Sequence, residues 1–273
     1  MAPGLALIAG GGRLPRVLAE AAQGAGRDLL IVGLEGMVDQ ETLAAGRSCV
    51  VPIGAAGRLM GVLRDEGIQD VVFAGKVRRP SFKEMKPDWR GVKFLAKIGA
   101  KALGDDGIMR AIIAAFEEEG FQVLPVDQVM RSLLAPLGPL GRHQPDERAL
   151  ADIRHGLQIA RILGQADVGQ AVVVQEGLVL GVEAIEGTDQ LIARVGPLHR
   201  EGPGGVLVKI KKPQQDRRAD LPTIGLATLE GVRAAGLRGI AIEAGATLVL
   251  DRNKLVEEAD KAGLFVVGVT VPP

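Results

Sequence analysis

The stretch Val206–Gly225, VLVKIKKPQQDRRADLPTIG, gathers residue types that could carry out phosphoryl-transfer chemistry. An apolar run ends at Lys209, and the polar segment after it combines lysines and arginines with Asp216 and Asp220. Basic side chains can neutralise a phosphorylated ligand, while carboxylates can hold a divalent cation or activate water. A charged surface turn has the same composition, and from these residues alone the two interpretations are equally supported.

A second acidic group follows an expected β-hairpin. The runs Gln170–Val174 and Leu178–Ala184 are typical of two strands, and the second leads directly into Glu183, Glu186 and Asp189. Side chains this close in sequence can converge on one point, although caps at the start of the next helix would use the same residue types. Alternation along the strand places Glu183 on the face opposite the apolar side chains.

Glycines mark the first strand-to-helix turn of the chain. Gly10, Gly11 and Gly12 lie between an apolar run, Leu5–Ala9, and the helical pattern Leu14–Ala22. Such a turn lets backbone N–H groups approach a phosphate at the positive end of a helix. The motif AGGGRLP lacks the full dinucleotide-binding spacing, so a nicotinamide cofactor is weakly supported. A tight turn that needs small residues is an equal alternative to phosphate binding.

A basic group follows the strand predicted at Val71–Ala74. Lys76, Arg78 and Arg79 come directly after it, at the carboxyl edge where open parallel sheets bind ligands. Three cations at this position suit a phosphate.

Composition narrows the classes of function. The 273 residues carry 33 Lys plus Arg against 33 Asp plus Glu, and only 3% are aromatic, which argues against nucleic acid as a partner. Cys49 is the single cysteine and the histidines number three, so neither a disulfide within the chain nor a cysteine-based zinc site is expected. The apolar start lacks a basic region and a cleavage pattern, and no apolar run is long enough to span a bilayer, so we expect a cytoplasmic protein.

Strands alternate with helices along the whole chain. This order predicts an α/β fold with helices packed on parallel sheets, and the length suggests two domains. A segment rich in proline and glycine, 135–145, interrupts both periodicities, so we predict an amino-terminal domain at 1–134, a linker at 135–145 and a carboxy-terminal catalytic domain at 146–273.

Five segments together resemble the UDP-2,3-diacylglucosamine pyrophosphatases of lipid A synthesis, the family without the calcineurin-like fold found in alphaproteobacteria and other Gram-negative bacteria. The order and content of all five carry the resemblance: LIAGGGRLP at Leu7–Pro15, AGKVRRP at Ala74–Pro80, LGDDGIMR at Leu103–Arg110, Asp167–Asp189, and Leu207–Gly225.

The resemblance implies a Rossmann-like amino-terminal domain and a family-specific α/β carboxy-terminal domain. It also implies hydrolysis of UDP-2,3-diacylglucosamine to UMP and 2,3-diacylglucosamine 1-phosphate (lipid X), with Mg²⁺ and attack of water on the sugar-side phosphorus. Asp220, in the ADLP segment, resembles the catalytic or metal-organising carboxylate, and Asp216 matches a position that is acidic in relatives.

The other site residues are assigned by their position and chemistry within these motifs. Asp216, Asp220 and Arg217 are the predicted catalytic residues, and the predicted metal ligands are Asp220, Asp216, Glu183 and Glu186. The predicted substrate-binding residues are Gly10, Gly11, Gly12, Lys76, Arg79, Gln170, Thr188, Lys209, Lys212, Gln215 and Thr223.

Two other functions stay open at this stage. A nucleotide-dependent oxidoreductase would use the glycine turn to bind NAD(P), and a non-enzymatic sensor would bind the nucleotide sugar without releasing UMP. The partner predictions are a lipid-linked nucleotide sugar, peripheral contact with the inner face of the inner membrane, and a homodimer. The sequence does not indicate the acyl chain length or the position of the acyl groove.

Overall fold

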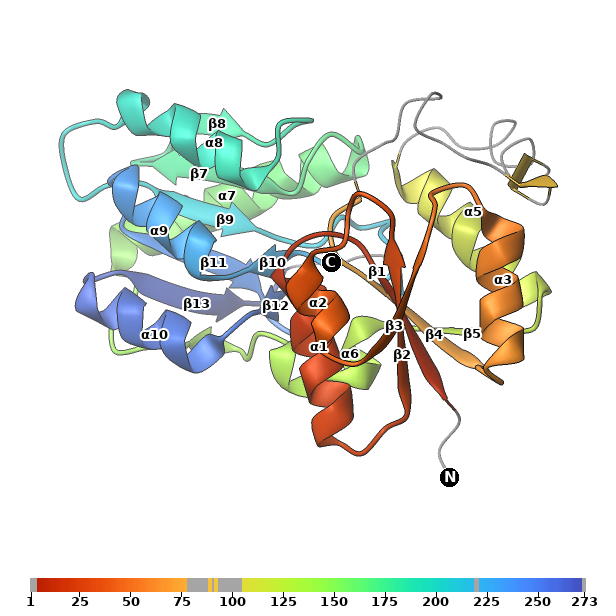
Figure 1. Cartoon of the computed structure of the whole chain (residues 1–273). Coiled ribbons are helices and arrows are strands. Elements are labelled where there is room, and N and C mark those ends of the chain that lie inside the picture. The colour runs from red at the N-terminus through yellow and green to blue at the C-terminus, as the bar shows by residue number, and fades with distance from the viewer. Residues whose placement is uncertain (1–3, 78–87, 90, 93–104, 219–220, 272–273) are drawn as a thin grey trace. The chain divides into compact units, whose positions relative to one another are not determined.

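The chain folds into two compact units in a computed structural model that describes residues 4–77, 88–89, 91–92, 105–218 and 221–271 (Figure 1). The first unit holds Met1–Ser132 together with Asp216–Asp220, and the second holds Leu133–Gln215 and Leu221–Pro273. The two-domain α/β architecture expected from the sequence is confirmed. The exact domain boundaries stay a prediction.

The first unit is built on a five-stranded parallel sheet with the strand order β3-β2-β1-β4-β5. Its strands are β1 (Leu5–Ala9), β2 (Leu29–Leu34), β3 (Arg47–Val51), β4 (Asp70–Ala74) and β5 (Gln122–Leu124). Its helices are α1 (Arg13–Gly24), α2 (Gln40–Ala44), α3 (Ala56–Asp65), α5 (Asp105–Glu118) and α6 (Val126–Val129). The order reverses between β1 and β4, as in doubly wound folds.

Burial explains why the strands of this unit are continuous apolar runs. Every residue of β1, LALIA, is buried, because helices cover both faces of the sheet. Helices α3 and α5 lie on one face and α1 and α6 on the other (Figure 1). The core on the first face includes Ile8 of β1, Met60 of α3 and Phe116 of α5.

The second unit is built on a six-stranded mixed sheet with the order β6-β13-β11-β9-β7-β8. Strands β9, β11 and β13 are parallel, and β7, β8 and β6 join them in antiparallel pairs. Separate from this sheet, β10 pairs in parallel with β12. The elements are β6 (Gly138–Pro139), α7 (Glu147–Gln165), β7 (Ala171–Gln175), β8 (Leu178–Val182), α8 (Thr188–Val195), β9 (Val206–Lys209), β10 (Thr223–Ile224), α9 (Leu226–Ala234), β11 (Gly239–Glu243), β12 (Leu248–Val249), α10 (Arg252–Lys261) and β13 (Phe265–Val269).

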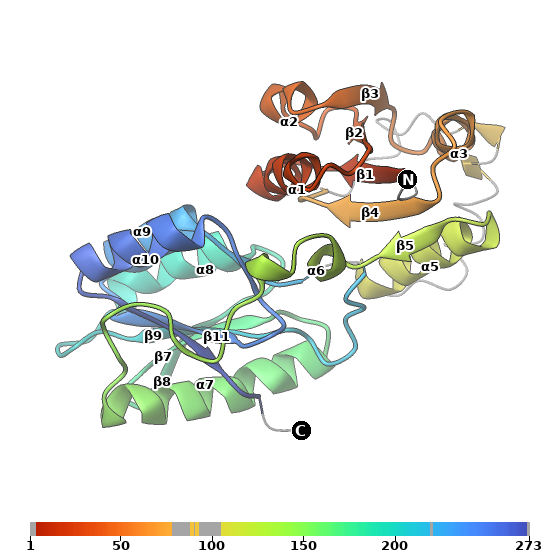
Figure 2. The same ribbon diagram turned by 90° about the horizontal axis from the view of Figure 1, so that it is seen from below.

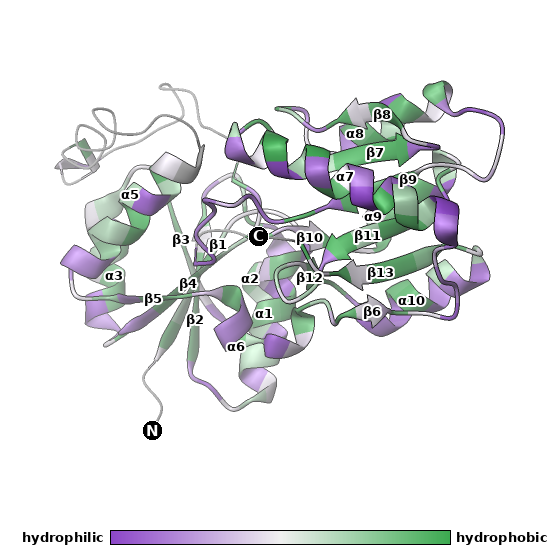
Figure 3. Cartoon of the chain, turned by 180° about the vertical axis from the view of Figure 1, so that it is seen from behind, coloured by the Kyte–Doolittle hydropathy of each residue, from purple (hydrophilic) through white to green (hydrophobic). Residues whose placement is uncertain are grey.

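Two apolar cores enclose this second sheet. Helix α7 covers one face, while α8, α9 and α10 cover the other (Figure 2). Colouring by hydropathy shows hydrophobic residues along the strands of each unit and hydrophilic residues on the helix surfaces (Figure 3). Among the described residues, no helix is both long and apolar enough to cross a membrane.

Several elements differ in extent from the sequence-based predictions. Strand β3 begins at Arg47, whereas the apolar run predicts a strand at Val50–Ile53. Helix α8 begins at Thr188, whereas the sequence pattern predicts a helix at Leu191–Val195. The segment 135–145, predicted to be a linker, packs on the second unit: Ala135 is buried in its core, and β6 pairs with β13. The N–H groups of Ala135 and Leu140 donate to the carbonyls of Thr247 and Val266 of the same unit.

Candidate functional site

At the carboxyl edge of the first sheet, the glycine turn after β1 meets the turn after β4. The N–H of Gly10 donates to the carbonyl of Ala74 (2.8 Å), and Gly11 and Lys76 exchange two backbone hydrogen bonds of 2.9 and 2.8 Å. The amides of Gly10 and Gly11 therefore already have protein acceptors. Of the three glycines predicted to hold a phosphate, these two serve first to join the turns.

Close packing makes glycine necessary here. Gly75 has a φ of 96°, and a Cβ at this position would lie 2.7 Å from the carbonyl oxygen of Gly11. Gly12, with a φ of 91°, precedes α1 as its N-cap without a side-chain cap, so it stays the glycine best placed at the positive end of a helix. Lys76 lies exposed at the same edge, and Arg79 lies outside the described residues.

In the second unit, the strand register brings the predicted binding residues to one edge of the sheet. Lys209, the last residue of β9, lies opposite Ala171 of β7 and Ile242 of β11. Gln170 therefore precedes β7 at the same edge at which β9 and β11 end. The carboxyl ends of parallel strands are where open α/β sheets bind ligands.

Lys209 is a buried cation at this edge, with 7% of its surface exposed. Its Nζ donates to the backbone carbonyl of Thr223 (3.1 Å), which links the end of β9 to β10. Next to it, the N–H of Lys211 donates to Oε2 of Glu243 at the end of β11 (2.8 Å). The buried ammonium group of Lys209 requires a hydrogen-bond acceptor, and the carbonyl of Thr223 provides one. The positive charge is thereby held in a fixed position.

The turn after β9 is held by side chains on both sides. Lys212 forms an ion pair with Asp167, with Nζ 2.7 Å from Oδ1, and its N–H donates to Oε1 of the buried Gln215 (3.3 Å). Gln214 donates to the carbonyl of Gly164 at 2.6 Å. Lys212 and Gln215, both predicted to bind substrate, therefore lie together in an ordered turn.

Glu183 has a different environment from the one expected of a metal ligand. Its side chain is buried, Oε1 accepts from the hydroxyl of Thr188 (2.8 Å) and Oε2 accepts from the N–H of Gln170 (3.0 Å). Both oxygens are thus engaged by protein donors that tie β7, β8 and α8 together. These contacts account for the burial of the Glu183 carboxylate.

Glu186 is likewise engaged by its neighbours. Oε2 accepts from the N–H of Ala184 (3.1 Å), and Oε1 pairs with Arg194 at 3.0 Å. Hydrogen bonding to its own backbone N–H, and less strongly to Arg194, lowers the pKa of this carboxyl below its ordinary value. In the described part of the chain, no three His, Cys, Asp or Glu side chains are grouped as a metal site would require.

Gln170 carries an acceptor that a ligand could use. Its side-chain Oε1 is buried, and among the described residues nothing donates to it. Buried polar atoms without a partner are uncommon and costly, by about 1–3 kcal/mol. An N–H or O–H group of a bound ligand would satisfy this oxygen, which supports the predicted binding role of Gln170.

The described residues of the segment that begins at Asp216 form ion pairs within the first unit. Arg217 donates to Oδ2 of Asp127 on α6 (2.8 Å), and Arg218 pairs with both Glu117 of α5 (2.5 Å) and Asp216 (2.7 Å). The hydrogen bond from Arg218 lowers the pKa of Asp216 below its ordinary value, so this carboxyl is ionised at neutral pH. Asp220 lies outside the described residues.

Asp127 and Glu117 were missed by sequence reasoning. They lie 90 and 101 positions before their arginine partners, and neither belongs to a recognisable motif. A carboxylate on a short helix carries no signal that predicts so distant an ion pair.

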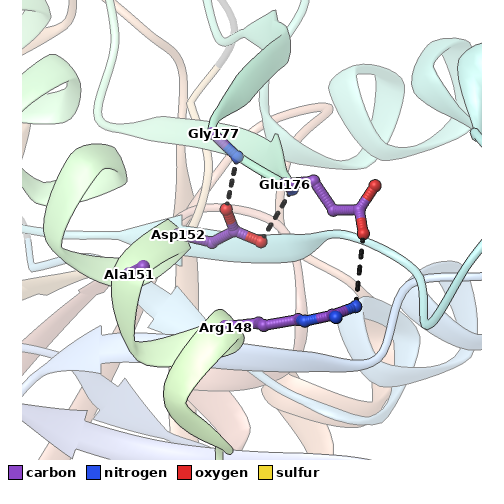
Figure 4. A pocket seen from close by; sticks show the side chains of 5 residues that line it. All are labelled: Arg148, Ala151, Asp152, Glu176 and Gly177. Carbon is purple, nitrogen blue, oxygen red and sulfur yellow. Dashed lines mark hydrogen bonds and ion pairs between the residues drawn. The ribbon is translucent and has the colours of Figure 1, made fainter.

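A surface cavity of about 290 Å³ lies elsewhere on the second unit, lined by Arg148, Ala151, Asp152, Glu176 and Gly177 (Figure 4). Asp152 points at the hairpin turn and accepts from the N–H groups of Glu176 (3.0 Å) and Gly177 (2.7 Å). These contacts hold α7 to the β7–β8 turn. The position of the Asp152 carboxylate in the cavity is therefore explained by its role in folding.

Solved structures resemble the chain only distantly. The biotin carboxylase subunit of pyruvate carboxylase is 11% identical, with 63% of this chain and 34% of that chain covered and a TM-score of 0.26. The complex of leucoanthocyanidin reductase with NADPH from Vitis vinifera is 16% identical, with 98% and 78% covered and a TM-score of 0.30. Scores this low support no argument about fold or function.

The sequence comparisons are specific. The family model of the LpxI N-terminal domain matches residues 4–133, and that of the LpxI C-terminal domain matches residues 136–267. The UDP-2,3-diacylglucosamine pyrophosphatase LpxI of Caulobacter vibrioides is 44% identical over 272 residues, which cover 97% of each chain. Both domain models match in order and the relative matches end to end, so the chain belongs to the LpxI family.

Proposed function

We propose that this protein hydrolyses the pyrophosphate bond of UDP-2,3-diacylglucosamine to UMP and 2,3-diacylglucosamine 1-phosphate in lipid A synthesis. The observation that carries the proposal is the 44% identity to a curated UDP-2,3-diacylglucosamine pyrophosphatase over 97% of both chains. The matches to the two family models, at residues 4–133 and 136–267, include every segment on which the sequence-based prediction rested.

The side chains at the carboxyl edge of the second sheet support binding of a charged, hydrogen-bonding ligand. Lys209 offers a fixed positive charge, and the buried Oε1 of Gln170 accepts a hydrogen bond. A preorganised cation stabilises the charge that develops on a leaving phosphate. We assign Lys209 and Gln170 to substrate binding on these grounds, and Asp216, Arg217 and Asp220 stay the proposed catalytic group.

A requirement for Mg²⁺ is part of the proposal, with a smaller set of ligands than the sequence suggests. Mg²⁺ takes one or two carboxylates and completes its shell with water and substrate phosphates. Glu183 and Glu186 accept hydrogen bonds that join separate elements of the second unit. The oxygens of Asp216 also have protein donors, but these belong to Arg218 of the same segment. We keep Asp216 and Asp220 as the proposed ligands because both lie in the segment that carries the proposed catalytic group; the bound ion would screen the phosphoryl oxygens and make bound water more acidic.

The lipid part of the substrate supports two further elements of the proposal. A cytoplasmic protein that acts on a diacylated sugar would make peripheral contact with the inner face of the inner membrane, and co-flotation with anionic lipid vesicles would measure this contact. A homodimer is also proposed, and light scattering of the purified protein would detect it.

Release of UMP from UDP-2,3-diacylglucosamine tests the function directly. We expect the wild-type protein to release UMP with added Mg²⁺ and to lose activity with a chelator. Asp220→Ala should lower turnover by on the order of 10³-fold or more, because it removes the proposed catalytic carboxylate. The control is Asp65→Ala, which changes an exposed carboxylate at the end of α3.

Each outcome of this assay decides between functions. Substrate binding without UMP release would favour the sensor, and binding of NAD(P) in place of uracil nucleotides would favour the oxidoreductase. Wild-type turnover in Asp220→Ala would overturn the catalytic assignment while leaving the overall reaction intact.

A further inference from the structure

The segment that begins at Asp216 is attached to the first unit although it lies in sequence between two strands of the second. Strand β9 ends at Lys209 and β10 begins at Thr223, and both belong to the second unit. Between them, the chain at Asp216–Asp220 clusters with the first unit. Two ion pairs, one to α6 and one to α5, make this attachment.

The pair between Arg217 and Asp127 is the better buried of the two. The side chain of Asp127 is 17% exposed and that of Arg217 is 40% exposed, whereas Arg218 and Glu117 are 36% and 45% exposed. Exposed pairs contribute little because water and salt screen them. Removing one partner of a part-buried pair has a greater effect, because the more buried Asp127 carboxylate loses its charge partner.

Asp127 also depends on Arg217 because of its second oxygen. Its Oδ1 is buried, and among the described residues no group donates to it. The carboxylate is therefore compensated mainly through Oδ2, which accepts from Nη2 of Arg217 at 2.8 Å. Displacing the arginine would leave most of a buried charge without a partner, so the geometry favours a fixed position for Arg217.

We infer that Asp127 is a positioning residue for hydrolysis, because it holds the guanidinium of Arg217, a member of the proposed catalytic group. Catalytic groups must be held close to their productive geometry, and misplacement by about 1 Å costs about a hundredfold in rate. This inference rests on the proposed function.

A role of Asp127 in folding alone is the competing explanation, and it makes a different prediction. If Asp127 only neutralises the charge of Arg217, its loss should lower stability and leave the turnover of the folded protein nearly unchanged. If Asp127 positions Arg217, its loss should lower the kcat of the folded protein.

The primary variant is Asp127→Asn, which keeps the side-chain shape and removes the charge. We expect kcat for UMP release to fall about tenfold, with KM within about twofold of wild type, because the substrate is still bound while the segment is less well held. The matched control is Asp70→Asn. Asp70 pairs with Arg27 in the same unit with similar burial, at 11% and 22% exposed, but far in sequence from the segment. It should lower Tm and leave kcat unchanged.

A conservative variant and a double variant separate positioning from general destabilisation. Asp127→Glu keeps the charge that pairs with Arg217 and should retain more of kcat than Asp127→Asn, while Asp127→Asn combined with Arg217→Ala should lower kcat no further than Arg217→Ala alone. Amide hydrogen exchange of the peptide that contains residues 216–218 provides a second readout: protection should fall in Asp127→Asn and be largely kept in Asp127→Glu.

The results distinguish failure of the inference from failure of the proposed function. No UMP release by the wild-type protein would overturn the function. With an active wild type, unchanged kcat in Asp127→Asn would overturn the positioning role. A double variant whose kcat falls well below that of Arg217→Ala alone would show that Asp127 acts independently of Arg217 and would also overturn it. Equal losses of kcat in Asp70→Asn and Asp127→Asn would show that both variants act through reduced stability, and would overturn the positioning role.

Discussion

The carboxyl edges of the two sheets occupy equivalent places in two α/β units and are built in different ways. In the first unit the edge is closed by backbone: Gly10 and Gly11 bond to the turn after β4, and glycines allow the close approach. In the second unit the edge is occupied by side chains, among them Gln170, Glu183 and Lys209, which bond across strands.

The carboxyl edge of an α/β sheet can therefore be built mainly from backbone contacts or mainly from side-chain contacts. Backbone closure fixes the described part of the first edge through the glycine turns, and Lys76 and the start of α1 lie at the same edge. Side-chain closure places a buried cation and an acceptor without a described donor at the second edge. Substitutions should therefore affect folding at the first edge and a mixture of folding and binding at the second.

The largest effect on stability is expected for Gly75→Ala. A Cβ would lie 2.7 Å from the carbonyl oxygen of Gly11 and 2.8 Å from Cγ of Pro15, and the φ of 96° is strained for alanine. Strain and steric conflict together should lower the free energy of unfolding by about 3 kcal/mol. Urea denaturation followed by circular dichroism measures this loss.

Gly36→Ala is the matched control for backbone closure. Gly36 has a φ of 74° in the same unit, but a Cβ there meets nothing within 4 Å. It should show the conformational cost alone, about 1 kcal/mol. Equal losses in the two variants would contradict the claim that close approach of the two turns fixes the first edge.

At the second edge, Glu183→Ala and Glu183→Gln should separate a structural role from a metal-binding one. Alanine leaves the N–H of Gln170 and the hydroxyl of Thr188 without their acceptor, which should cost about 2 kcal/mol of stability. Glutamine can accept from Gln170 and donate to the Thr188 hydroxyl, so we expect nearly full stability and turnover.

Titration of UMP release with Mg²⁺ makes this comparison decisive. Glu183→Gln should show the wild-type dependence on Mg²⁺ if the carboxylate only joins β7, β8 and α8. A large rise in the Mg²⁺ concentration required, with unchanged stability, would restore Glu183 to the metal site and remove the contrast drawn between the two edges.

The sequence predicts elements whose hydrophobic pattern is local. It does not predict contacts between side chains that lie far apart in the chain. Continuous apolar runs such as β1 and β7 identify buried strands, because both faces are covered. Helix α2 is five residues long and has one buried residue, Thr42. Such a short helix has too little hydrophobic periodicity to be predicted from the sequence. The carboxylates of Glu183 and Glu186 have the chemistry of metal ligands, but their partners are set by the fold.

The attachment of residues 216–218 shows the same limit in the candidate site. A run of charges predicts a functional segment, yet the sequence does not say which carboxylates its arginines will meet. Asp127 and Glu117 come from two helices far earlier in the chain. Only the fold brings them into contact, so their role could not be derived from spacing.

The smallest effect is expected at the opposite, amino edge of the second sheet, which serves as a background for the carboxyl edge. Asp146 caps α7 by accepting from the N–H of Ala149 (2.8 Å), and it pairs with Arg238, just before β11, at 2.6 Å. The hydrogen bond from Arg238, and next the one from Ala149, lowers the pKa of Asp146 below 3.8. Because the pKa is lower in the folded state, the stabilisation is complete above about pH 4 and is lost as pH falls through the folded-state pKa.

Asp146→Asn keeps a competent cap and removes the charge. It should lower Tm slightly at pH 7 and low salt, with the difference from wild type shrinking towards pH 3 and in high salt, because this pair is exposed and screened. Turnover should stay at the wild-type level, since the side chain lies at the edge away from Gln170 and Lys209. Thermal unfolding across this pH range, with UMP release at pH 7, measures both. A loss of turnover comparable to that of Asp127→Asn would show that polar contacts affect catalysis wherever they lie on these sheets, and the contrast between edges would then have no functional meaning.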